Sequence, residues 1–353
     1  MPNINLSRKD IAALIQGPPL VAVLIGATTG IGSYVARALA NTFAKDGNKL
    51  RVYVVGRNAS RAETLLTYGR QTSPGSDWRF VAVPDLTLMS HVDRFSQEVI
   101  KQEQASPFTG GPPRIDLLYM SQALSPMQES PATKEGLDSQ MSLLFYSRMR
   151  FIQNLTPLLN ASPKIAHVIS IFAGGFEDAV KPDEIPIGIP SKKDYGVSSV
   201  RKHVAFMKTF AFEHLAEQHA GKISFIHIYP GLVDGPVFYS DVNPTWFKIL
   251  WRLLKPLASF YMTSPEVCGE VMLSLATSRY PAKGEANSRD VAGGVAYSTQ
   301  RELAGGAYGV GMRGDEGKDV SYAKVRNNDT AQKVWEHLME VFEGIEKLSS
   351  DTR

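Results

Sequence analysis

Short apolar runs alternate with amphipathic stretches from residue 20 to residue 229 of the chain. An apolar, mostly β-branched run predicts a buried parallel strand, and apolar positions at helical spacing predict a helix. The predicted strands are 21–25, 50–56, 78–83, 114–120, 164–172 and 223–229, and the predicted helices include 33–40, 90–104, 135–159 and 195–219. This alternation predicts an α/β fold: a doubly wound parallel sheet of the Rossmann type with helices on both faces.

The first predicted strand runs directly into a glycine-rich turn, Gly26-Ala27-Thr28-Thr29-Gly30-Ile31-Gly32, and a helix follows. The three glycines remove side chains where the backbone must approach an anionic ligand. The exposed N–H groups and the positive end of the helix dipole attract a pyrophosphate. This order predicts a dinucleotide site formed by Gly26, Thr28, Thr29, Gly30, Ile31 and Gly32. The alternative is a glycine-rich turn without a ligand.

Composition argues against several other functions. The chain has 353 residues, 43% of them hydrophobic, which is enough for one large or two modest domains. Its net charge of +3, without a block of basic residues, does not indicate a nucleic-acid partner. The single cysteine, Cys268, rules out an intramolecular disulfide, and the seven histidines lack metal-ligand spacing, so we expect no metal. No signal peptide and no apolar run of roughly 20 residues occurs, so we expect a soluble cytoplasmic protein without membrane association.

Several motifs, in their order along the chain, resemble those of the short-chain dehydrogenase/reductase family. The glycine turn resembles the family's Gly-x-x-x-Gly-x-Gly loop, and the order of elements resembles the family's to about residue 280. Asp85-Leu86 resembles the pair that contacts adenine, and Pro230-Gly231-Leu232-Val233 resembles the turn along the nicotinamide. The resemblance implies a nicotinamide cofactor with contacts from Asp85, Leu86, Ser121, Gln122, Pro230, Gly231 and Val233.

The end of the second predicted strand indicates which nicotinamide cofactor binds. It reads Gly56-Arg57-Asn58, where an acidic residue would bond the ribose hydroxyls of NAD. An arginine pairs instead with a 2′-phosphate, and Arg61 lies one helical turn further on. We therefore expect NADP(H), held in part by Arg57 and Asn58. The alternative is that Arg57 is a solvated surface charge.

The catalytic positions depart sharply from the family, whose chemistry uses Asn, Ser, Tyr and Lys. Alignment places Leu144 at the asparagine position and Ala173 at the serine position. Tyr195 matches the tyrosine, but the residue four positions later is Ser199 instead of lysine. A register shifted by one would put Gly196 at the tyrosine position. Tyr195 is the candidate catalytic residue, with Arg201 and His203 nearby, and the chain resembles divergent fungal members with a degenerate tetrad.

The sequence after residue 236 has a different character. Residues 236–262 are rich in aromatic and apolar side chains, and in this family that region forms the substrate lid, which here would suit a bulky hydrophobic substrate. A helix packed on the body or at a homo-oligomer interface is an equal alternative, and a membrane-surface helix is a weaker one. Residues 282–320 look like an exposed excursion, and 329–348 predict a terminal amphipathic helix. We divide the chain into a dinucleotide-binding domain, 1–280, that includes the lid, and a C-terminal helical and loop extension, 281–353.

Three functional hypotheses follow. The first is an NADP(H)-dependent oxidoreductase acting on a bulky hydrophobic ketone or alcohol in specialised metabolism, where divergent fungal members of the family often occur. The second is a non-redox isomerase, dehydratase or cyclase in which Tyr195 works as an acid. The third is a pseudoenzyme that binds the nucleotide without catalysis. The fold alone does not choose among them.

Overall fold

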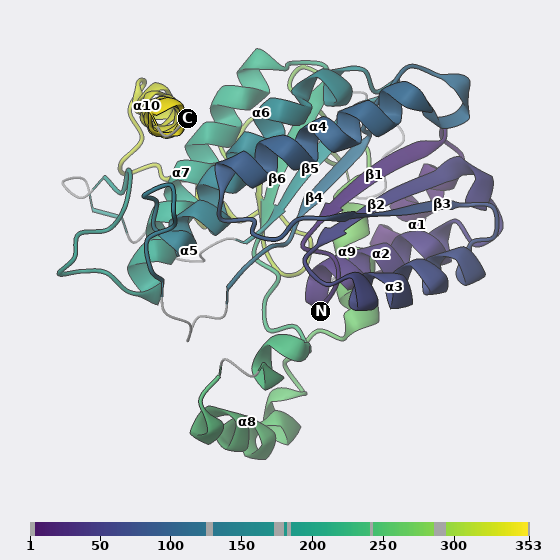
Figure 1. Ribbon diagram of the computed structural model, residues 1–353, viewed down its shortest axis with the longest axis horizontal. Coiled ribbons are helices and arrows are strands. Elements are labelled where there is room, and N and C mark those ends of the chain that lie inside the picture. The colour runs from purple at the N-terminus through teal and green to yellow at the C-terminus, as the bar shows by residue number, and fades with distance from the viewer. Residues whose placement is uncertain are drawn as a thin grey trace.

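The computed structural model describes residues 4–124, 130–172, 180–181, 185–240, 243–285 and 294–351. Its centre is a parallel sheet of seven strands in the order β3-β2-β1-β4-β5-β6-β7 (Figure 1). The strands are β1 (Leu20–Ile25), β2 (Leu50–Gly56), β3 (Asp77–Ala82), β4 (Leu117–Met120), β5 (Ala166–Ile171), β6 (Ile223–Ile228) and β7 (Ala307–Val310). The predicted Rossmann-type fold is confirmed.

Helices cover both faces of the sheet (Figure 1). One face carries α1 (Ile4–Ile15), α2 (Gly30–Thr42), α3 (Ala59–Thr72) and α9 (Pro265–Ser274). The other carries α4 (Met89–Ala105), α6 (Ser147–Asn160), α7 (Val197–Gln218) and α10 (Thr330–Asp351). Shorter elements are η1 (Gly47–Lys49), η2 (Phe108–Gly110), α5 (Ser139–Met141), the π-helical turn η3 (Ser142–Tyr146), η5 (Pro236–Tyr239) and η7 (Lys318–Ser321). Helix α8 (Thr245–Ala258) projects away from this body.

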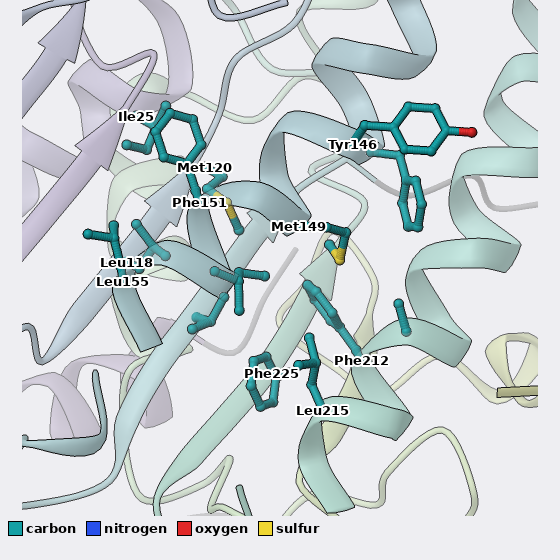
Figure 2. Packing of buried hydrophobic residues seen from close by; sticks show 14 of the residues in the cluster. Ile25, Leu118, Met120, Tyr146, Met149, Phe151, Leu155, Phe212, Leu215 and Phe225 are labelled. Carbon is teal, nitrogen blue, oxygen red and sulfur yellow. The ribbon is translucent and has the colours of Figure 1, made fainter. Parts of the chain in front are cut away.

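The core consists of two apolar layers, one on each side of the sheet. Figure 2 shows part of the layer under α6 and α7, where Phe151 and Leu155 lie over Leu118, and Phe212 lies beside Phe225. All residues of β1 and β2 are buried, as expected for central parallel strands, and the one charged side chain among them, Arg51, pairs with the buried Glu103 at 2.8 Å. None of the described helices is long and apolar enough to cross a membrane.

Two predicted elements begin at least three residues later than expected. The strand predicted from residue 114 begins at Leu117, after the buried Asp116, whose carboxylate accepts hydrogen bonds from the Val21 amide (2.8 Å) and the Ser162 hydroxyl (2.6 Å). The helix predicted from residue 135 begins at Ser139, because Asp138 caps it by accepting from the Met141 amide at 2.8 Å.

The expectation that 282–320 is an exposed excursion is wrong at Ala307–Val310. These four residues are buried and pair with β6 as a seventh parallel strand. Gly309, in the middle of the strand, allows close packing, because a Cβ there would collide with the side chain of Val320. A strand of four residues with an internal glycine carries too little apolar pattern to be predicted. The sheet therefore takes a strand from beyond residue 280.

Candidate active site

The glycine turn after β1 is closely packed on two sides and open on the third. A Cβ on Gly26 (φ +76°) would lie 2.8 Å from the Gln122 amide nitrogen, and one on Gly32 would lie 2.7 Å from the Ala27 Cα. Gly30 (φ +59°) differs, because no described atom lies within 4 Å of where its Cβ would be. The backbone at Gly30 thus borders free space at the carboxyl edge of the sheet, as a pyrophosphate cradle requires.

Helix α2 begins at this open point. Thr29 precedes it in an extended conformation, and among the described residues its side chain caps none of the first amides. Ser33 turns its hydroxyl back onto the Gly30 carbonyl at 2.7 Å. Thr28 instead packs over the end of β2, where a Cβ on Gly56 would lie 2.5 Å from its methyl carbon. The backbone amides in the first turn of α2, including that of Ile31, therefore face the open side of the glycine turn. The Thr29 side chain accepts no hydrogen bond from them.

Arg57 follows β2 directly and is exposed. Within the described part of the chain it forms no hydrogen bond and no ion pair. Its neighbour Asn58 is committed to the fold, since its side-chain oxygen caps α3 by accepting from the Arg61 amide at 2.8 Å. Arg57 is thus a positively charged side chain beside the glycine turn that has no partner among the described residues. The sequence places no acidic residue at the end of β2.

Asp85 and Leu86 follow β3 and shape the next turn. One oxygen of Asp85 accepts from the Thr87 amide (2.8 Å) and the Thr87 hydroxyl (2.6 Å). Leu86 is buried in the core. Asp85 is only half-buried, and its second oxygen has no hydrogen bond from the described residues.

Ser121 and Gln122 follow β4 and form the floor beneath the glycine turn. The amide and the hydroxyl of Ser121 both donate to the Ile25 carbonyl, each at 2.9 Å. Gln122 is buried, and its amide donates to the Ser147 hydroxyl at 3.5 Å. Its side-chain oxygen has no hydrogen-bond partner among the described residues. The serine hydroxyl is therefore used to join β1 to β4.

The turn after β6 contains Pro230, Gly231 and Val233. A Cβ on Gly231 (φ +71°) would lie 2.8 Å from the side chain of Met312, so the glycine lets the residues after β7 close on the turn. Val233 is buried and bridges to Thr263. The Tyr34 hydroxyl donates to the Asp234 carbonyl at 2.9 Å, which ties this turn to α2.

Tyr195 lies just before α7 and is partly exposed. Its hydroxyl donates to a carboxylate oxygen of Asp138 at 2.7 Å, and Ser130 donates to the same oxygen at 3.1 Å. Partial burial raises the pKa of Tyr195, and the hydrogen bond and charge of Asp138 raise it further. Ser199 donates to the Asp194 carbonyl at 2.6 Å. Tyr195 therefore holds its proton at neutral pH instead of acting as a base.

Two fully buried cations lie behind the ends of β4 and β5. Arg148 donates to the Gln122 carbonyl at 2.6 Å and to the Ser170 hydroxyl at 2.7 Å. Lys208 donates to the Phe172 carbonyl at 2.8 Å. Burial, together with the positive charge of Arg148, lowers the pKa of Lys208 well below its ordinary value. A guanidinium keeps its charge at neutral pH, so Lys208 is the member of the pair whose charge is lost more readily as the pH rises.

The comparisons with known proteins decide the family. No family model matches the chain. It is 50% identical over 353 residues to the short-chain dehydrogenase/reductase SAT2 of Stachybotrys chartarum, an alignment that covers 99% of both proteins. It is 31% identical over 345 residues to oxidoreductase AN1596 of Emericella nidulans, covering 96% of this chain and 97% of that protein. This chain belongs to the short-chain dehydrogenase/reductase family. It is accordingly an enzyme and an oxidoreductase.

A solved structure of the family shares the fold. The L-sorbose reductase of Gluconobacter frateurii, solved with NADPH and L-sorbose, superposes with a TM-score of 0.53 at 20% identity, covering 84% of this chain and 97% of that one.

Two residues were assigned from the sequence to catalytic positions of the family. Leu144, assigned to the asparagine position, is buried within the π-helical turn η3. Ala173, assigned to the serine position, lies outside the described residues. His203, a nearby candidate, donates a hydrogen bond from Nδ1 to the Gly188 carbonyl at 2.8 Å, and partial burial lowers its pKa.

Sequence reasoning missed Arg148 and Lys208. A signal was present for Lys208, which interrupts the apolar run Phe206-Met207-Lys208-Thr209-Phe210. No sequence signal distinguished Arg148 from Arg150, which lies two residues later in the same helix. Arg150 instead donates to Asp93 at 2.6 Å on the outside of α6.

Proposed function

We propose that this enzyme uses NADP(H) to reduce a bulky apolar ketone, or to oxidise the corresponding alcohol. Arg57 carries the proposal: it is an exposed arginine with no partner among the described residues, at the strand end where family members that use NAD hold an acid. The two relatives are named as a short-chain dehydrogenase/reductase and an oxidoreductase, which supports a redox reaction. The proposal includes a place in specialised metabolism, which rests on the resemblance of the variant motifs to divergent fungal members.

The described residues fit the cofactor. Open space above Gly30 and the uncapped start of α2 suit a pyrophosphate, and Arg57 suits a 2′-phosphate. The free side of Asp85 suits the adenine end, and the turn of Pro230, Gly231 and Val233 suits the nicotinamide end. When bound, the nicotinamide would exchange a hydride with the carbonyl carbon of the substrate.

The chain itself must supply a proton to the ketone oxygen. Tyr195 is the candidate, because Asp138 fixes the position of its hydroxyl and keeps it protonated. The usual lysine is Ser199 here, and its hydroxyl is turned to the Asp194 carbonyl. The raised pKa makes the tyrosine a weaker acid than the family's, and its hydroxyl would turn from Asp138 to the ketone oxygen to donate its proton.

The segment 236–262 supplies the apolar lining. Phe238 stacks on Trp251, with ring centroids 3.9 Å apart and an interplanar angle of 14°. The stack joins η5 to α8, and η5 follows in sequence the turn that suits the nicotinamide. A flat apolar wall of this kind favours a ring-containing substrate over a small polar one.

The proposal is tested by following absorbance at 340 nm with NADPH and with NADH. The panel contains bulky cyclic and aryl ketones and, as a matched set, small hydroxyketones. We expect NADPH to be consumed with the bulky set and at a lower rate with the small set. No consumption with any ketone or alcohol would overturn the redox proposal, and turnover without nucleotide would favour an isomerase or dehydratase.

A further inference from the structure

Helix α8 is the least covered helix among those that the structure describes. None of its side chains is buried against the described residues. It is joined to the body by the Phe238–Trp251 stack and by an ion pair of 3.1 Å between Lys255 and Asp234. In Figure 1 it projects from the molecule below the sheet, between the chain that leaves β6 and the chain that enters α9.

One face of this helix is apolar and points outward. Leu253 and Leu257 are 72% and 68% exposed, and Trp246, at the start of the helix, is 59% exposed. With Ile249, Leu250 and Leu254 they repeat at intervals of three and four residues, so they form a single stripe. Phe247 and Trp251 lie outside this stripe and are half-buried on the body side. We call the outward stripe the α8 apolar face.

The charged residues of α8 lie on its polar face and are all positive. Lys248, Arg252 and Lys255 follow each other at helical spacing on the side of the helix away from the α8 apolar face, and residues 243–265 contain no aspartate or glutamate. Lys255 pairs with Asp234, whereas Arg252 is exposed. Basic residues on the polar face, with tryptophan and leucine on the other, are typical of a helix that lies in the surface of a bilayer with acidic headgroups.

Aromatic residues at both ends of α8 fit the same partner. Trp246 stands at the start, and Phe260 and Tyr261, just after the helix, are 79% and 83% exposed. Such rings favour the boundary between headgroups and acyl chains. A helix of 14 residues is roughly 21 Å long, too short to span a bilayer but suited to lie in its surface.

We propose that α8 is a docking helix for an anionic membrane surface, with the α8 apolar face inserted at the headgroup boundary and Arg252 and Lys248, on the polar face, at the level of the lipid phosphates. This goes beyond the proposed reaction and does not depend on it. It takes up the membrane-surface helix that the sequence offered as a weaker alternative for residues 236–262.

Co-sedimentation with vesicles tests the proposal, using the full chain without nucleotide or substrate. One set of vesicles is phosphatidylcholine, and the other contains about 30% phosphatidylglycerol. We expect partitioning onto the anionic vesicles to be at least about tenfold stronger, and to fall with added salt. Leu253→Ser combined with Leu257→Ser should abolish most of the binding. Arg252→Glu should weaken it on anionic vesicles only, and Leu348→Ser, an exposed leucine on α10, should leave it unchanged.

Two results would overturn the proposal. In the first, the double serine variant binds vesicles as the wild type does, or the wild type shows no preference for anionic lipid. In the second, vesicles are not bound and light scattering shows a dimer that the double variant dissociates, so that a second copy covers the face. Circular dichroism checks that the variants fold. An NADPH titration of the same proteins distinguishes failure of this proposal from failure of the proposed function. Loss of nucleotide binding would contradict only the proposed function.

Discussion

Polar groups at the ends of the strands differ in burial and hydrogen bonding between the two halves of the sheet. Beside β1, β2 and β3, the open turn at Gly30 and the uncommitted Arg57 leave hydrogen-bonding groups free at the carboxyl edge. Beside β4 and β5, Arg148 and Lys208 are fully buried, and backbone carbonyls and a serine take up their donors. Under the proposed function, the groups that would bind the nucleotide lie in the first half, whereas the two buried basic residues of the second half support the fold.

The largest effect is expected at the glycine turn. Gly30→Val places a branched side chain in the open space and strains a backbone at φ +59°. We expect nucleotide binding to be lost while the fold persists, as measured by fluorescence titration and circular dichroism. Gly110→Val is the matched control: Gly110 has φ +71° and equally open surroundings, but lies before β4 at the other edge of the sheet. If both variants bind alike, the turn is not the pocket.

The next effect concerns the proton donor. Tyr195→Phe should lower kcat by roughly 10²–10⁴-fold, the usual contribution of one general acid, with little change in nucleotide affinity. Tyr297→Phe, an exposed tyrosine beyond residue 280, should have no effect. Ser199→Lys is the sharper variant, because an ammonium at 199 should strengthen nucleotide binding if Tyr195 occupies the family position. A Tyr195→Phe enzyme that turns over at the wild-type rate would exclude the tyrosine mechanism.

The third effect tests the buried cations of the second half. The pKa of Lys208 is lowered in the folded protein, so the unfolded chain binds more protons between that value and about 10.5. Stability should therefore rise as the pH increases through this window. Lys208→Met should lack this rise, whereas the exposed lysine variant Lys192→Met should keep it. Urea unfolding of the three proteins from neutral pH to about pH 10 gives the slopes, and equal slopes would place Lys208 in contact with solvent.

Much of the first half could be predicted from the sequence. The apolar runs located β1 and β2 within a residue, and the glycine turn was correctly expected between β1 and α2. These features are local, since each depends on a few consecutive residues. The burial of Lys208 depends on Phe172 and Arg148, which are distant along the chain, so local pattern could not reveal it. The outward face of α8 was equally hidden, because an apolar stripe predicts a buried face whenever a partner is assumed.

The most direct test of the account is the affinity of the wild-type enzyme for NADPH and NADH, measured beside Arg57→Ala. We predict that NADPH binds more tightly, and that removing Arg57 weakens NADPH roughly 10- to 150-fold, the equivalent of about 1.5–3 kcal/mol for one charge-assisted hydrogen bond. NADH affinity should hardly change, and Arg61→Ala should have a smaller effect on both. Equal affinities for the two nucleotides in the wild type would contradict the account.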